Sequence, residues 1–239
     1  MQVLAIIPAR GGSKGIPRKN LHPFLGKPLI YWSILAAQES TLIDRILVST
    51  EDAEIAGIAS ELGAEVPFLR PASLATDDAT DYPVIRDCVE KLETNEGLRP
   101  EVIVQLRPTS PLRPTGLIDE GIQMLVDTPD ADSLRVVCEP QNNPYKMWRL
   151  AGKFMQPLIE TSIDEAFNQP RQKLPEAYWQ IGTLDVIRTK TIFEKKSLSG
   201  SKILPLVVDP SIAIDIDDMD SLERAEIVFE KFLSQGEGN

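Results

Sequence analysis

The sequence has few of the side chains that bind transition metals or form disulfide frameworks. It contains one histidine, His22, and two cysteines, Cys88 and Cys138, and it has no CxxC motif. We therefore expect no zinc site. Because both cysteines lie among apolar neighbours, we expect them to be buried free thiols of a cytoplasmic protein.

Long apolar runs and an excess of positive charge are also missing. No run approaches the roughly 20 residues that a membrane span requires, and no basic segment with a cleavage site precedes the first apolar run. The chain carries 25 Lys and Arg against 36 Asp and Glu, a net charge of −11. Such a surface repels nucleic acid and anionic membranes, so we expect neither as a partner.

The sequence does contain a regular alternation of apolar runs of strand length with segments of helical periodicity. Strands are expected at residues 3–8, 45–49, 65–68, 102–106, 133–138 and 203–208, and helices at 28–38, 53–62, 82–92, 116–125 and 221–233. This alternation predicts an α/β fold whose mostly parallel sheet is covered by helices on both faces. Asp52 and Thr115 are expected to cap the helices that follow them.

Residues 139–180 interrupt this alternation. They hold several prolines and two of the three tryptophans, Trp148 and Trp179. We therefore predict a core of residues 1–138 plus 181–239 and an inserted segment of residues 139–180. The exposed apolar surface of that segment would form an interface or a lid. Residues 235–239 are expected to form a frayed tail.

A basic glycine-rich loop follows the first expected strand. Its cations are Arg10, Lys14, Arg18 and Lys19, beside Gly11 and Gly12. Glycines let backbone N–H groups approach phosphate oxygens, and the cations neutralise their charge. The loop matches neither the Walker A nor the GxGxxG pattern. We expect Arg10 and Lys14 to bind a triphosphate and Lys19 to bind a phosphate of the substrate or product.

Two carboxylates near the end of the chain are separated by one residue. Asp215 and Asp217 would project to the same side of an extended segment. Adjacent carboxylates repel unless a cation lies between them, and Mg²⁺ prefers oxygen ligands with phosphates completing its shell. We therefore expect Asp215 and Asp217 to hold Mg²⁺. The alternative is an acidic N-terminus for the last helix.

Two further loops follow expected strands, where ligands of parallel sheets bind. The segment LRPTSPLR places Arg107 and Arg113 beside prolines and the hydroxyls of Thr109 and Ser110, which suits an anionic or polyhydroxylated partner. Residues 69–81 could surround a nucleobase with hydrogen-bond partners and an apolar wall. A structural turn and a helix cap are the respective alternatives.

Together these pieces resemble the acylneuraminate cytidylyltransferase family, the CMP-sialic acid and CMP-nonulosonic acid synthetases. The matching segments, in order, are IIPARGGSKGIPRKN, LVSTEDAEIA, VPFLRPASLATDDAT, LRPTSPLR, QPRQKLP and IDID. The resemblance implies a Rossmann-like nucleotidyltransferase fold, a Mg²⁺-dependent reaction of CTP with a sugar acid, and a homodimer. In that dimer the inserted segment would reach the neighbouring subunit.

The resemblance also assigns roles to individual residues. It implies that the nucleotide is bound by Arg10, Gly11, Gly12, Ser13, Lys14, Lys19 and Asn20, with Arg70, Ala79 and Asp81 lining the base. Asp215 and Asp217 would hold Mg²⁺. The sugar acid would contact Arg107, Thr109, Ser110 and Gln180, with Lys146 and Arg171 contributed across the dimer.

Three departures from the family pattern concern specificity. Arg107 stands where sialic-acid members have a glutamine that touches the sugar, and residues 179–183 read WQIGT where RPNGA is common. Asp81 stands where a small hydroxyl residue is common. Its carboxylate could accept the amino group of cytosine or the N–H edge of guanine.

The expected reaction is attack by a sugar hydroxyl on the α-phosphorus of CTP, with pyrophosphate leaving. Arg10 and Lys14 would stabilise the charge, and Asp217 or a metal-bound water would take the hydroxyl proton. The alternatives are a cytidylyl- or guanylyltransferase for another sugar or sugar phosphate, and a nucleotide-binding protein without catalysis.

Overall fold

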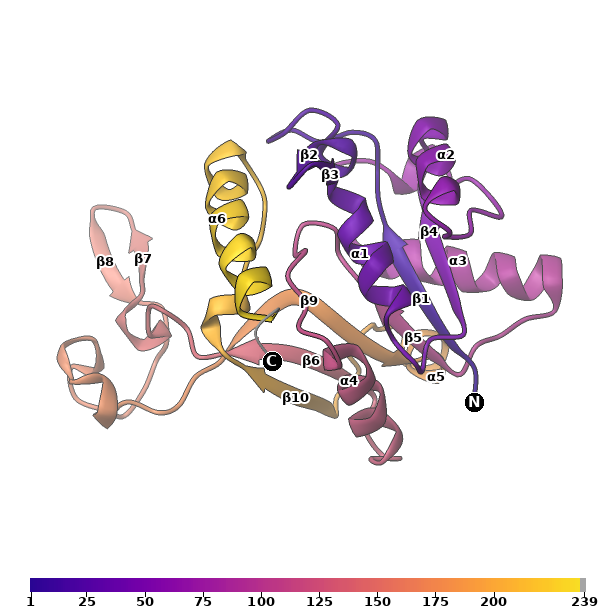
Figure 1. Cartoon of the computed structure of the whole chain (residues 1–239). Helices are drawn as coiled ribbons and strands as arrows, with labels where there is room; N and C mark the ends of the chain where they lie inside the picture. Colours follow the sequence, from indigo (N-terminus) through magenta and orange to yellow (C-terminus); the bar gives the residue numbers. More distant parts are fainter. Residues whose placement is uncertain (237–239) are drawn as a thin grey trace.

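The computed structural model describes residues 1–236. The first two residues of the expected tail, 235 and 236, belong to the last helix, and the other three lie outside the described residues. The centre of the structure is a six-stranded sheet in the order β10-β6-β9-β5-β1-β4 (Figure 1). The strands are β1 (Val3–Pro8), β4 (Arg45–Ser49), β5 (Val102–Gln105), β6 (Ser133–Cys138), β9 (Trp179–Arg188) and β10 (Ile203–Val208). Only β9 runs antiparallel to its neighbours, β5 and β6, in this sheet. The predicted α/β fold with a mostly parallel sheet is confirmed.

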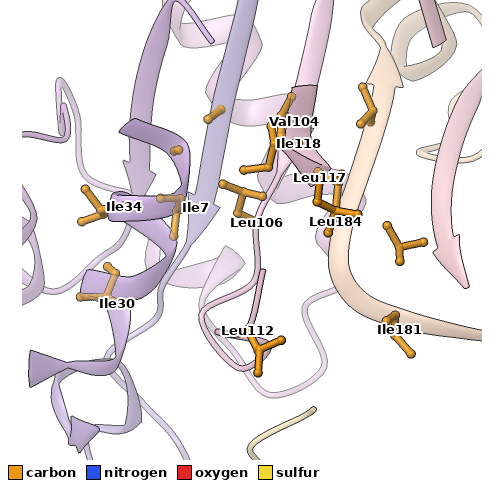
Figure 2. Close-up of a cluster of buried hydrophobic side chains, with 14 of the residues drawn as sticks. Ile7, Ile30, Ile34, Val104, Leu106, Leu112, Leu117, Ile118, Ile181 and Leu184 are labelled. Atoms are coloured by element: carbon orange, nitrogen blue, oxygen red, sulfur yellow. The ribbon is translucent and has the colours of Figure 1, made fainter. Parts of the chain in front are cut away.

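Helices cover both faces of the sheet, as predicted. They are α1 (Leu29–Gln38), α2 (Ala53–Glu61), α3 (Asp81–Glu96), α4 (Leu117–Val126), α5 (Thr189–Glu194) and α6 (Met219–Gly236). Apolar side chains of α1, α4 and α6 pack in one core cluster, and those of α3 and α5 pack in a second. Figure 2 shows the first cluster, where Ile7 of β1 and Val104 of β5 meet Ile34 and Ile118 from the helices.

Two local predictions are wrong, and two elements of the fold were not predicted. Residues 65–68 form only an isolated bridge, between Glu65 and Leu47, because Pro67 has no N–H to continue the pairing. Thr115 is not a helix cap: Gly116 holds that position with φ of 84°, a left-handed conformation that glycine adopts without strain. The sequence pattern predicts neither strand β9 nor helix α5.

Two other local predictions are confirmed. Asp52 caps α2 by accepting hydrogen bonds from the backbone N–H groups of Glu54 and Ile55. Cys88 and Cys138 are buried free thiols. Within residues 1–236, no helix combines the length and apolar character that crossing a membrane would require.

The segment between β6 and β9 leaves the sheet and projects from one side of the molecule (Figure 1). It contains a hairpin of β7 (Trp148–Ala151) and β8 (Phe154–Pro157). Leu150 and Phe154 of this hairpin are 82% and 67% exposed. The predicted insert therefore carries the expected exposed apolar surface, although Trp179 and Gln180 belong to β9 rather than to the projecting segment.

Candidate functional site

A cavity of about 310 Å³ lies at the carboxyl ends of β1 and β5, where ligands of parallel sheets bind. Eleven of the predicted site residues line it: Arg10, Gly12, Ser13, Lys19, Asn20, Arg70, Ala79, Asp81, Arg107, Thr109 and Asp217. The cavity thus joins the basic loop after β1, the loop before α3, the loop after β5 and the segment before α6.

The basic loop is held in place by contacts within the loop and by contacts to neighbouring segments. Asn20 is buried and donates from Nδ2 to the carbonyl oxygen of Arg10 at 2.8 Å, which closes the loop on itself. The N–H of Gly11 donates to Glu51 at 2.7 Å, so Gly11 lies behind the cavity rather than in its lining. A Cβ on Gly15 would lie 1.8 Å from the carbonyl oxygen of Asp217. Only glycine therefore permits this close approach.

The segment with the carboxylate pair is bonded to two sides of the cavity. Ile216 is fully buried, and its N–H donates to the carbonyl oxygen of Thr109 at 2.8 Å. The carbonyl oxygen of Ile216 accepts a hydrogen bond from Lys19 Nζ at 2.6 Å. The same Nζ lies 3.3 Å from Asp217 Oδ1. These contacts hold Asp217 beside the basic loop.

Two cations of the loop share one partner that the sequence did not single out. Asp77, between η2 (Ala72–Leu74) and α3, lies 3.0 Å from Arg10 Nη2 and 2.7 Å from Lys14 Nζ. Its carboxylate lines the cavity, whereas the Lys14 side chain is 81% exposed and does not. The hydrogen bond from Lys14 and the charges of both cations hold the pKa of Asp77 below its usual value. An anionic carboxylate thus sits where phosphate oxygens are expected.

Asp215 and Asp217 provide the hard oxygen donors that suit Mg²⁺. Desolvation and then the charge of Asp217 raise the pKa of Asp215, against a hydrogen bond from Thr109. A cation between the two carboxylates would relieve this repulsion, so the donor set fits a divalent metal. Asp217 lines the cavity and Asp215 lies outside its lining. Within residues 1–236, no cluster of three or more potential ligands of the His, Cys, Asp and Glu type occurs.

Arg107 is engaged by two carboxylates of the chain. Its guanidinium donates to Asp81 Oδ2 and, at 2.7 Å, to Asp185 Oδ2. Asp185 lies fully buried in the middle of β9 and also pairs with the buried Arg135. Burial lowers the pKa of Arg107, but the charges of Asp185 and Asp81 outweigh it, so the pKa is raised. Arg107 is therefore a fixed cation in the cavity wall.

Two other arginines hold the walls of the cavity. The buried Arg70 donates to Ser49 Oγ at 3.0 Å and to the carbonyl oxygen of Leu74 at 3.4 Å, which ties the loop before α3 to the end of β4. Arg113 donates to the carbonyl oxygens of Thr183 and Arg107, both at 2.8 Å. Burial lowers the pKa of both arginines.

Four predicted sugar-binding residues do not line this cavity. Ser110 is buried outside its lining, whereas Lys146, Arg171 and Gln180 are exposed on the insert or at the start of β9. Arg171 pairs with Glu139 at 2.5 Å and lines a separate hollow between the insert and β10. Within one subunit these residues are not brought to the cavity.

Asp77 and Asp185 are the candidate residues that sequence reasoning missed. Asp77 lies in the LATDDAT segment beside Asp78, and the sequence does not distinguish these two neighbouring acidic residues. Asp185 could have been identified from the sequence, because a charged residue inside the apolar run LDVI predicts a buried partner of opposite charge.

Comparison with known proteins gives concordant results. A family model described as Cytidylyltransferase matches residues 4–174. The chain is 30% identical over 240 residues to a pseudaminic acid cytidylyltransferase of Campylobacter jejuni, covering 96% of this chain and 97% of that protein. It is 33% identical over 223 residues to a CMP-N,N'-diacetyllegionaminic acid synthase of Legionella pneumophila, covering 91% of each chain.

The fold has solved counterparts. The structure of a CMP:2-keto-3-deoxy-manno-octonic acid synthetase complexed with CTP superposes with a TM-score of 0.70 at 15% sequence identity. The match covers 97% of this chain and 99% of that one, so the two proteins share their fold along their whole length.

Proposed function

Because the chain belongs to the cytidylyltransferase family, we propose that it transfers CMP from CTP to a hydroxyl of a nonulosonic acid, releasing pyrophosphate. The observation that carries this proposal is the meeting of the basic loop and Asp217 in one cavity. Relatives named for pseudaminic and legionaminic acid support a sugar acid as acceptor.

The chain's own residues account for most of the chemistry. The sugar hydroxyl oxygen forms a bond to the α-phosphorus while the bond to the bridging oxygen of pyrophosphate breaks. Arg10 and Lys19, which line the cavity, would bind the phosphates and stabilise the charge on the leaving group, and Lys14 would join them from the exposed side of the basic loop. Asp217, one of three carboxylates that line the cavity, or a metal-bound water would receive the hydroxyl proton. Asp215 and Asp217 would hold Mg²⁺, which when bound would neutralise phosphate charge.

The acceptor side of the site is proposed to be completed by a second subunit. Lys146 and Arg171 lie on the projecting insert, outside the cavity of their own subunit. The exposed Leu150 and Phe154 of the same insert suit burial in a homodimer. Sedimentation of Leu150→Glu with Phe154→Glu is expected to yield monomers with little turnover. A dimer that survives both substitutions would contradict this arrangement.

The activity is tested by pyrophosphate release with CTP, GTP, UTP and ATP in turn. The acceptors are pseudaminic acid, legionaminic acid, N-acylneuraminic acid and, as comparison, sugar phosphates. We expect release only with CTP and a sugar acid. Release with GTP or with a sugar phosphate alone would instead favour the guanylyltransferase or sugar-phosphate alternative, and CTP binding without release from any acceptor would favour a binding protein.

A further inference from the structure

The two oxygens of the Asp81 carboxylate have different surroundings. Oδ2 accepts hydrogen bonds from Gln105 Nε2 at 2.7 Å and from Arg107 Nη2 and Nε at 2.7 and 3.2 Å. Among the described residues, no hydrogen bond reaches Oδ1. Because Asp81 lines the cavity, one of its oxygens is occupied by the protein and the other is available to a ligand.

The occupied oxygen is held from the interior of the sheet. Arg107 Nη1 donates to the fully buried Asp185 at 2.7 Å, and Asp185 also pairs with Arg135. Each of the three nitrogens of the Arg107 guanidinium therefore donates to a carboxylate of the chain. This leaves Arg107 as a bridge between β9 and the start of α3 rather than a free cation for a sugar.

The surroundings of Asp81 suit a nucleobase. Leu74, Ala79 and Val84 line the cavity with it, and the cations Arg10 and Lys19 line the same cavity. A base needs an apolar wall with a small number of fixed polar groups, and its phosphates need cations within the length of a nucleotide.

We propose that Arg107, supported by Gln105 and Asp185, determines base selectivity by occupying one oxygen of Asp81 and leaving a single acceptor for the base. Cytosine presents an amino group where uracil presents a keto oxygen, so the free oxygen attracts the first and repels the second. The edge of guanine presents two adjacent donors, which would need both carboxylate oxygens. This inference rests on the proposed function and assigns Arg107 to the nucleotide rather than to the sugar.

The test is a calorimetric titration of CTP, UTP and GTP into the wild-type chain and its variants. We expect the wild type to bind CTP about tenfold or more tightly than UTP, because a site built around a hydrogen bond rejects a ligand that lacks it. Asp81→Asn and Arg107→Gln should each lower the CTP to UTP affinity ratio about tenfold. Arg107→Gln should also raise GTP affinity relative to CTP, because it removes the charged donor from the second oxygen and leaves only the hydrogen bond from Gln105 there. Asp185→Asn should act in the same direction.

Arg45→Gln is the matched control, because Arg45 likewise bridges two carboxylates, Glu65 and Glu96, but lies outside the cavity. It should leave all three affinities unchanged. Thermal unfolding shows whether each variant is folded. If Arg107→Gln does not fold, Arg107→Lys replaces it and should also lower the CTP to UTP ratio, since one ammonium group cannot reproduce the three-nitrogen bridge.

Unchanged ratios in folded Arg107 variants would overturn the inference, whether or not sugar turnover falls. A wild type that binds CTP and UTP equally would also overturn it. The titration needs no acceptor, so it separates this inference from the proposed function. CTP selectivity that depends on Arg107, in a chain that turns over no sugar acid, would support the inference and refute the proposed function.

Discussion

The ammonium nitrogen of Lys19 lies 3.3 Å from Oδ1 of Asp217, a residue 198 positions further along the chain. The same nitrogen donates to the backbone carbonyl of Ile216 at 2.6 Å. The side chain of Lys19 is only 11% exposed, whereas that of Asp217 is 78% exposed. Lys19 thus holds the segment before α6 against the basic loop after β1. The Asp217 carboxylate remains exposed, so a ligand can reach it.

Removing the carboxylate of Asp77 should strengthen CTP binding. Asp77 pairs with Arg10 and Lys14, so a triphosphate must displace it before it can use both cations. Exposed ion pairs are weak, so Asp77→Asn should lower the Kd for CTP only about two- to fivefold in a calorimetric titration. The neighbouring exposed Asp78→Asn is the control for general electrostatics and should change the Kd less. Weaker binding in Asp77→Asn would mean that Asp77 holds the cations in place for the phosphates.

Removing one carboxylate of the proposed metal pair should reduce turnover without unfolding the chain. Asp215→Asn and Asp217→Asn should each lower the rate of pyrophosphate release about 10²–10³-fold, since each would lose a major electrostatic contact. A chelator should abolish release by the wild type, and added Mg²⁺ should restore it. Asp220→Asn, in the first turn of α6, should behave as the wild type. Wild-type rates in Asp215→Asn would remove that residue from the metal site.

A methyl group at Gly15 should displace the segment before α6. The added Cβ would lie 1.8 Å from the carbonyl oxygen of Asp217, so backbone has to move. Gly15→Ala should destabilise the chain by about 1–3 kcal/mol in urea unfolding and reduce turnover. Gly57→Ala is the control, because a Cβ on this exposed helical glycine of α2 meets no atom within 4 Å. Equal stability of the two variants would show that the loop and Asp217 are not packed as described.

The buried carboxylate of Asp132 should make folding stability depend on pH. It accepts hydrogen bonds from Lys195 Nζ at 2.7 Å and from the N–H groups of Ser201 and Lys202. The Lys195 hydrogen bond is the largest cause that lowers the pKa of Asp132. A lowered pKa in the folded state stabilises the fold above the ordinary value of about 4, and this contribution is lost as the pH falls further.

Urea unfolding of Asp132→Asn checks this prediction. At pH 7 the variant should be less stable than the wild type by about 1.5–3 kcal/mol, and the difference should narrow below about pH 4. Asp130→Asn removes an exposed partner of Lys202 and should leave the stability close to that of the wild type. A difference for Asp132→Asn that is constant from pH 7 to pH 3 would exclude the ionised form as its source.

Strands with two buried faces could be located from the sequence to the residue. Strand β1 is an apolar run that ends at Pro8. Strand β6 is apolar except for Ser133 and Arg135 and ends before the proline-rich insert, and the predicted bounds of both strands match those of the structure. Strand β9 could not be predicted, because Gly182 and Asp185 interrupt the apolar pattern of its sequence. Asp185 is tolerated there only because Arg107 and Arg135 neutralise it. Arg107 lies in the loop after β5 and Arg135 lies in β6, so the sequence around Asp185 does not reveal that these residues contact it.

Part of the candidate site could also be predicted from the sequence, and part could not. The meeting of the loops after β1 and β5 follows from the rule that parallel strands end at one edge of the sheet. The partners of individual side chains do not follow from it. Arg107 reads as a free cation in LRPTSPLR, yet its hydrogen bonds go to Asp81 and Asp185. Spacing predicted which loops form the cavity, whereas tertiary contacts decide which charges remain available to a ligand.

The central claim is that the loop after β1 and Asp217 bind one nucleoside triphosphate between them. A crystal structure of the chain grown with CTP and Mg²⁺ tests this most directly. The claim predicts phosphate oxygens within hydrogen-bond distance of Arg10 and Lys19, with Asp217 on the same side of the triphosphate. A triphosphate bound elsewhere on the chain, away from Arg10 and Asp217, would contradict it.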